Sequence, residues 1–119
     1  MIVGTDAPLL PHQLERIARR VGMGLGRLGS WAGNSSGDLF LAFSTANAGA
    51  ARSDGTPALI MLPNDRINPL FQATIDATEE AVVNAMLAAQ TMTGADGIRS
   101  FGLPGDRVVA ALRKYNRMK

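Results

Sequence analysis

The stretch NSSGDLFLAFS, residues 34–44, places a small polar turn directly before the most strand-like apolar run in the chain. Within it, a single glycine separates the Ser36 hydroxyl from the Asp38 carboxylate. Side chains two residues apart on a strand project to the same side, so these oxygen groups converge if the strand register already holds at Ser36. Such a pair can carry chemistry, or it can simply close a turn, because Ser, Gly and Asp are common turn residues.

Upstream of this stretch, the sequence predicts a strand and a helix. Residues 1–5 are typical of a short strand, whose abrupt start suggests that further sequence precedes it. Two prolines then break the strand, and a helix is expected from about Pro11 to Val21, where the glycine-rich residues 22–29 end it. The buried face of this helix is expected to carry Leu14, Ile17, Ala18 and Val21.

Downstream, the sequence predicts two strands and two helices. Residues 38–44 are apolar at nearly every position, which indicates a strand covered on both faces. Residues 45–56 are typical of a surface loop, and residues 57–63 are expected to form a third strand bounded by prolines. A long helix is predicted from Asn68, a good N-cap, to about Met92, and a final amphipathic helix starts at Pro104.

Together these elements indicate an α/β or α+β layer arrangement in one domain, residues 1–119. The long helix is apolar well beyond one narrow stripe, which indicates that the chain packs against more protein than it contains. Many residues of that stripe are small, so the helix is expected to lie close to a neighbouring element. The stripe comprises Phe71, Ile75, Thr78, Val82, Ala85, Met86 and Ala89.

The composition narrows the possible functional classes. The 119 residues are 46% hydrophobic, which is enough for the core of one domain. A formal net charge of +2 is too small to imply a nucleic-acid partner. The chain has no cysteine, which excludes disulfides and thiolate metal sites. No apolar run approaches the roughly 20 residues of a membrane span, so we expect a soluble chain with no membrane partner.

Other motifs offer little chemistry. The segment GLGRLG, residues 24–29, matches the dinucleotide fingerprint, but that fingerprint follows a strand and here a helix precedes it. His12 is the single histidine, and no His, Asp or Glu pair falls at metal-ligand spacing, so neither a metal nor another cofactor is expected. A solvated helix surface is predicted for the basic group Arg16, Arg19, Arg20 and Arg27.

Three blocks of sequence carry a family resemblance. They are TDAPLLPHQL at residues 5–14, SGDLFLAFST at residues 36–45, and INPLFQAT at residues 67–74, which is followed by TEEA at residues 78–81. In this order, and over nearly the whole chain, they resemble the L-aminopeptidase/D-esterase family, which includes the β-aminopeptidases.

The resemblance implies a catalytic arrangement. Members of this family are made as precursors that cleave themselves into an α chain and a smaller β chain, whose new N-terminal Ser or Thr is the nucleophile. This sequence resembles the β chain but begins a few residues inside it, so the nucleophile is expected upstream of Met1. By resemblance, Ser36 would orient or relay protons, and Asp38 would position the α-amino group that acts as the base.

The resemblance also implies a fold and partners. It predicts an α+β sandwich of two sheets between helix layers, completed by the α chain and assembled further into homo-oligomers. The substrate would be a peptide or an amino-acid amide, with L-, D-, β-amino and natural-product amides left open. A cytoplasmic location is expected, or a periplasmic one if the α chain carries a signal.

Two alternatives remain at this point. The chain could be a catalytically silent homologue that serves as an oligomerising or binding module, with Met1 as its true start. It could also bind a nucleotide through residues 24–29.

Overall fold

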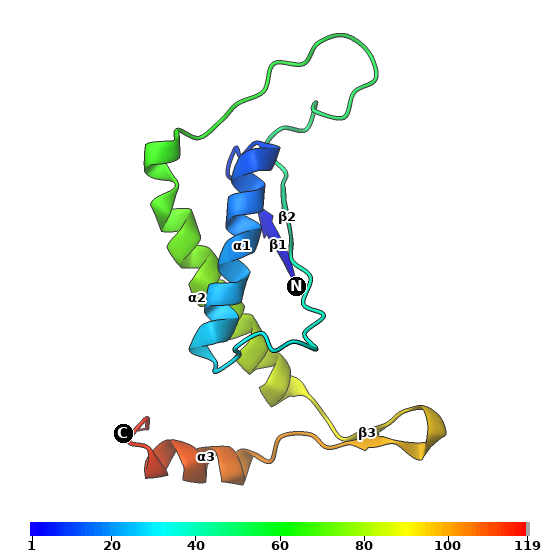
Figure 1. The fold of residues 1–119 in the computed structure, drawn as a ribbon, viewed down its shortest axis with the longest axis vertical. Helices are drawn as coiled ribbons and strands as arrows, with labels where there is room; N and C mark the ends of the chain where they lie inside the picture. Colours follow the sequence, from blue (N-terminus) through cyan, green and yellow to red (C-terminus); the bar gives the residue numbers. More distant parts are fainter. Residues whose placement is uncertain (119) are drawn as a thin grey trace. The chain divides into compact units, whose positions relative to one another are not determined.

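The computed structural model describes residues 1–118 and divides into two compact units, Met1–Glu79 and Glu80–Lys119 (Figure 1). Helices and small sheets both occur, as expected for an α+β chain. The elements are, in chain order, β1 (Ile2–Thr5), α1 (Pro11–Arg27), β2 (Leu41–Ser44), the 3-10 turn η1 (Asn64–Arg66), α2 (Asn68–Ala88), β3 (Met92–Thr93), the 3-10 turn η2 (Ala95–Gly97), β4 (Arg99–Ser100) and α3 (Gly105–Lys114).

In the first unit, β1 and β2 pair in parallel, with α1 as the connection between them. The register runs from Ile2 opposite Leu41 to Thr5 opposite Ser44. The predicted first strand is therefore confirmed. The predicted second strand is three residues too long, since residues 38–40 precede the ladder. Parallel pairing brings the N-terminal ends of both strands to the same edge.

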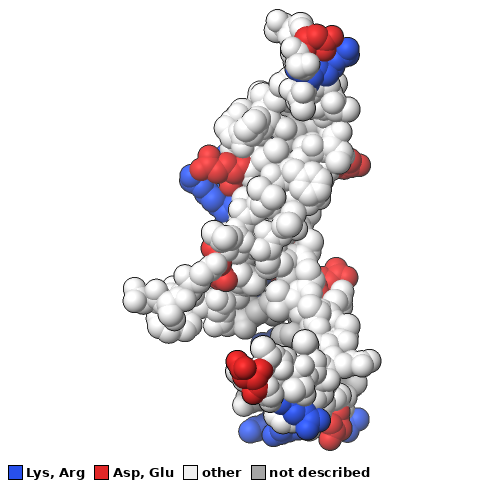
Figure 2. Space-filling model, turned by 90° about the vertical axis from the view of Figure 1, so that its right-hand side faces the viewer, with Lys and Arg blue, Asp and Glu red and all other residues white. Residues whose placement is uncertain are grey.

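Only one face of this strand pair is covered. Val3 and Ala42 pack against the core formed with α1, whereas Ile2, Leu41 and Phe43 on the other face are 70%, 58% and 47% exposed. The Phe43 ring lies over Gly4, where a Cβ would come within 2.9 Å of Cζ. Within this chain, the strand predicted to be covered on both faces is covered on one face only. A largely uncharged surface is visible in Figure 2 from the side on which β2 lies in Figure 1.

The predicted third strand does not form. Residues 57–63 contain no strand, because no described strand offers its backbone to them. Instead, the Asn47 side chain takes the place of a strand neighbour for Ile60. Its Oδ1 accepts from the Ile60 N–H at 2.9 Å, and its Nδ2 donates to the Ile60 carbonyl at 3.1 Å. This Asn47–Ile60 clasp closes the base of the long loop that separates β2 from η1.

Helix α1 is longer than the sequence predicted. It begins at Pro11 as expected but continues through Gly22, Gly24 and Gly26 to Arg27. The reason is packing against α2, since Gly24 is buried and a Cβ there would lie 2.7 Å from Thr78 Cβ and 2.8 Å from the Ile75 carbonyl oxygen. Tertiary contact therefore overrides the low helix propensity of glycine.

Helix α2 begins at Asn68, as predicted, but ends at Ala88 rather than near Met92. Its buried residues belong to its first half and are Phe71, Thr74, Ile75 and Thr78. The Thr74 and Thr78 hydroxyls donate to the carbonyls of Leu70 and Thr74, each at 2.7 Å, so both buried polar groups are satisfied within the helix. The rest of the predicted stripe is half-buried at Val82 and exposed at Ala85, Met86 and Ala89.

A small apolar core with one polar anchor holds the first unit together. Leu9, Ile17, Ile67 and Phe71 form the core cluster. Beside it, the fully buried Gln13 amide donates from Nε2 to the Leu62 carbonyl at 2.8 Å and to Asn64 Oδ1 at 2.9 Å. Its Oε1 accepts from the Leu10 N–H at 3.2 Å. Gln13 thereby connects the start of α1 to the segment that leads into η1.

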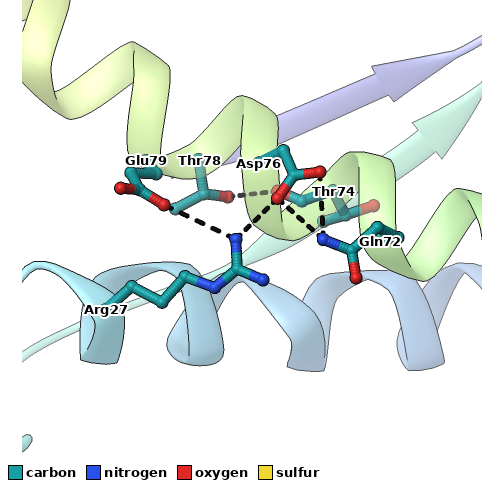
Figure 3. Close-up of polar contacts among 6 residues, drawn as sticks. All are labelled: Arg27, Gln72, Thr74, Asp76, Thr78 and Glu79. Atoms are coloured by element: carbon teal, nitrogen blue, oxygen red, sulfur yellow. Dashed lines mark hydrogen bonds and ion pairs between the residues drawn. The ribbon is translucent and has the colours of Figure 1, made fainter.

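An ion pair joins the end of α1 to α2 (Figure 3). Arg27 Nη1 lies 2.6 Å from Asp76 Oδ1 and 3.5 Å from Glu79 Oε2. Gln72 Nε2 also donates to both Asp76 oxygens, at 2.8 Å and 3.0 Å. The hydrogen bonds from Gln72 and then Arg27 lower the pKa of Asp76 below its usual value, and the Asp76 hydrogen bond raises the pKa of Arg27. Arg27 is exposed, as the predicted solvated surface requires, but its side chain also pairs with α2.

The second unit contains the short antiparallel pair of β3 and β4 and the helix α3. α3 begins directly after Pro104, close to its predicted start, and Arg113 and Lys114 lie in its last turn, where the helix dipole favours cations. Across the described part of the chain, no helix has both the length and the apolar character needed to span a membrane.

We expect Gly24→Ala to destabilise the protein by about 1–3 kcal/mol, because the added methyl group overlaps the α2 backbone. The matched control is Gly26→Ala, two residues away on α1, where a Cβ would meet no atom within 4 Å. Since alanine is the better helix former, this control should raise stability by about 0.5–1 kcal/mol. Urea unfolding of both variants measures the difference, and equal effects would contradict close packing at Gly24.

The Arg27–Asp76 pair predicts a pH-dependent contribution to stability. The pKa of Asp76 is lower in the folded protein than its reference value of 3.8, so the stabilisation is present above that value and is lost as the pH falls through the folded-state pKa. Asp76→Asn should therefore lower the urea midpoint at pH 7, and the difference from wild type should shrink in acid and in high salt. Glu80→Gln serves as the control, since Glu80 takes part in no ion pair among the described residues.

Candidate active site

The two residues singled out by the sequence lie in the loop between α1 and β2. The Ser36 N–H donates to the Gly33 carbonyl at 2.8 Å, and the Asp38 N–H approaches Ser36 Oγ at 3.4 Å. These contacts are those of a serine-stabilised turn, so the turn interpretation of the segment is correct in geometry. The strand register does not extend back to Ser36, because β2 begins only at Leu41.

The loop nevertheless brings the two side chains together. Ser36 and Asp38 are both exposed, and both line a hollow of about 230 Å³ together with Gly22 and Leu25 of α1 and Phe40. Ser30 and Ala32 complete this hollow, which we call the α1 hollow. Ala32 has a positive φ of 49°, a conformation that is uncommon outside glycine and is often found at functional sites.

The amino-terminal end of β1 lies beside this loop. The Met1 amino group donates to the Leu39 carbonyl at 2.7 Å, and the Leu41 N–H donates to the Met1 carbonyl at 3.0 Å. The backbone of the loop therefore contacts the amino-terminal end of β1 at Leu39, the residue that follows Asp38 in the sequence.

The remaining candidates do not join this site. His12 lies exposed in the first turn of α1. Gly24 and Gly26 are inside α1, so residues 24–29 do not form the strand-to-helix turn that a dinucleotide fingerprint requires. The nucleotide-binding alternative therefore loses its structural basis. Among the described residues, no three His, Asp or Glu side chains cluster to hold a metal ion.

The basic side chains of α1 have local partners. Arg16 and Arg20 lie over the Phe71 ring, 5.1 Å and 3.9 Å from its centroid. Arg19 pairs with Glu15 one turn earlier on the exposed face. Their positions agree with a surface role, with Arg16 and Arg20 also shielding a core aromatic ring.

Sequence reasoning missed the contribution of α1 to the hollow, because it ended the helix near Gly22. A signal for the longer helix was present. Buried positions recur at Ile17, Val21 and Gly24, which continues the three-and-four spacing of one helix face. With α1 extended, Gly22 and Leu25 fall beside the loop that carries Ser36 and Asp38.

Solved structures similar to this chain share its fold. The L-aminopeptidase D-Ala-esterase/amidase from Ochrobactrum anthropi, described as a variant of the Ntn hydrolase fold, aligns with a TM-score of 0.84 and 43% identity. The alignment covers 99% of this chain and 34% of that protein. A β-aminopeptidase from Burkholderia sp. aligns with a TM-score of 0.80 and 42% identity, over 95% of this chain and 34% of that one.

Curated relatives agree with the structural matches. The β-peptidyl aminopeptidase BapA of Sphingosinicella microcystinivorans is 44% identical over 119 residues, which is 99% of this chain and 30% of the relative. BapA of Sphingosinicella xenopeptidilytica is also 44% identical, over 95% of this chain and 29% of the relative. The chain therefore spans about 30% of the length of the curated relatives it matches. The sequence model of peptidase family S58 matches residues 1–100, and the chain belongs to this family.

Proposed function

We propose that this chain is the β-chain portion of a self-cleaving N-terminal-nucleophile aminopeptidase, in which Ser36 and Asp38 support a Ser or Thr nucleophile that precedes Met1. The observation that carries this proposal is the register of β1 and β2. Paired residues differ by 39 in number, as Ile2 and Leu41 do. If this pairing continued beyond Met1, the residue before Met1 would lie opposite Leu39. The two residues before that one would lie opposite Asp38 and Gly37.

This placement would suit nucleophile activation. A terminal Ser or Thr hydroxyl is a weak nucleophile, and its own α-amino group, with an ordinary pKa of about 7.7–8.0, is a suitable base near neutral pH. The Asp38 carboxylate would stabilise the ammonium group that forms when the amine takes the hydroxyl proton. The Ser36 hydroxyl, which can both donate and accept, would hold the amine or pass its proton on.

The exposed apolar face of the β1–β2 pair supports the proposal of a partner chain. Ile2, Leu41 and Phe43 leave apolar surface on the face opposite α1, and a second sheet would bury it. We propose that the α chain of the same precursor supplies this sheet, which gives a sandwich of two sheets between helix layers. Further assembly of αβ units into homo-oligomers is part of the same proposal.

The proposed reaction is hydrolysis of an amide bond that releases the amino-terminal residue of a peptide or an amino-acid amide. It rests on the names of the matched proteins, which are a β-peptidyl aminopeptidase and an L-aminopeptidase D-Ala-esterase/amidase. An acyl-enzyme formed on the terminal hydroxyl would then be hydrolysed by water.

The test uses the complete precursor with Ser36→Ala and Asp38→Asn, and with Ser35→Ala as the matched control. Ser35 is an exposed neighbour that does not line the α1 hollow. Removing a group that transfers protons should slow amide hydrolysis by about 10²–10⁴-fold. Asp38→Asn should also move the acidic limb of the kcat/KM profile to lower pH, because loss of the carboxylate lowers the pKa of the neighbouring amine.

Intact mass would show whether the precursor cleaves itself, and release of nitroaniline from amino-acid nitroanilides would report hydrolysis. A precursor that neither cleaves itself nor hydrolyses any amide would refute the proposal and favour a silent binding module. Equal activity in wild type and both site variants would refute the roles of Ser36 and Asp38.

A further inference from the structure

The α1 hollow lies directly against the proposed catalytic groups and is formed partly by a helix with no assigned role. Its lining combines Gly22 and Leu25 of α1 with Phe40, Ser36 and Asp38. We propose that this hollow receives the side chain of the substrate's amino-terminal residue and that Gly22 sets the size of the side chain accepted. This inference rests on the function proposed above.

The dimensions of the hollow favour a side chain over a whole ligand. Its volume is about 230 Å³, below the roughly 300–1,000 Å³ of pockets that enclose drug-sized ligands. An aliphatic or aromatic side chain fits within such a space. The backbone of the same substrate residue would remain outside, near the edge where β1 begins.

The chemistry of the lining agrees with this occupant. Leu25, Phe40 and Ala32 offer hydrocarbon surface for an apolar side chain. Ser36 and Asp38 lie on the same lining, so a side chain held there is adjacent to the groups proposed to support the nucleophile. Among the described residues, no cation lies within ion-pair distance of Asp38, which leaves its carboxylate available to an amine.

The glycine at position 22 of α1 is not explained by helix propensity or by packing. Glycine inside a helix is unfavourable by about 0.5–1 kcal/mol relative to alanine. At Gly24 close packing explains the glycine, but at Gly22 a Cβ would meet only Phe40 Cε2, at an ordinary 3.8 Å. Packing of the described residues therefore does not require glycine at position 22. Its missing side chain does leave space in the hollow beside Phe40.

The experiment compares the complete wild-type protein with Gly22→Ala and Gly22→Val on glycine, alanine, leucine and phenylalanine nitroanilides. Added methyl groups should fill the hollow and exclude large side chains. The ratio of kcat/KM for the leucine substrate to that for the glycine substrate should fall at least about ten-fold in Gly22→Val, and less in Gly22→Ala. Thermal unfolding of Gly22→Ala should match or exceed wild type, because its methyl group meets no clash.

The matched control is Gly26→Ala, a glycine of the same helix that does not line the hollow and meets no atom within 4 Å. It should leave the substrate ratio at the wild-type value. A folded, self-cleaved Gly22→Val protein with an unchanged ratio would overturn the inference. So would loss of α-chain association in Gly22→Ala, because the hollow would then be covered by the rest of the protein and not by substrate. Wild type inactive on every amide would instead refute the proposed function, and the inference with it.

Discussion

The close approach of α1 to α2 at Gly24 is the contact on which the length of α1 and the start of the site loop depend. Thr78 Cβ and the Ile75 carbonyl oxygen occupy the space that any larger residue would need at position 24. This contact keeps α1 helical beyond Gly22 and brings Arg27 within reach of Asp76 and Glu79. The loop that carries Ser36 and Asp38 starts directly after Arg27. The absence of a side chain at Gly24 thus allows α1 to continue to Arg27, where the loop with Ser36 and Asp38 begins.

Much of the local structure could be predicted from the sequence, since the strand at residues 2–5 and the helix starts at Pro11, Asn68 and after Pro104 all follow from short-range signals. The errors arose where tertiary contacts decide. Glycine propensity suggested an end at Gly22, but packing against Thr78 extends α1. The apolar run at residues 57–63 favoured a strand, yet a strand needs a neighbouring strand. The described chain offers this segment isolated contacts instead, from the Asn47 side chain to Ile60 and from Pro8 and Gln13 to Leu62.

For the candidate site too, the sequence indicates the residues that are close in the chain but not the contacts between distant residues. The sequence indicated Ser36 and Asp38 as a pair, and the structure places them on one hollow. The helical spacing of Ile17, Val21 and Gly24 indicates how far α1 extends, but no local pattern shows that the loop folds back to lie beside Gly22 and Leu25. The Met1 amino group lies at the Leu39 carbonyl only because β1 and β2 pair in parallel, a contact between residues 38 positions apart.

The Asn47–Ile60 clasp separates the long loop from the rest of the first unit. Both backbone groups of Ile60 are satisfied by one amide side chain, so the ends of the loop are held together whatever lies between them. Residues 50–59 are exposed, and loop-closure entropy rises only slowly with length. This segment can therefore vary in length or accept an inserted tag without disturbing β2 or α2, which makes it a natural attachment point for a label.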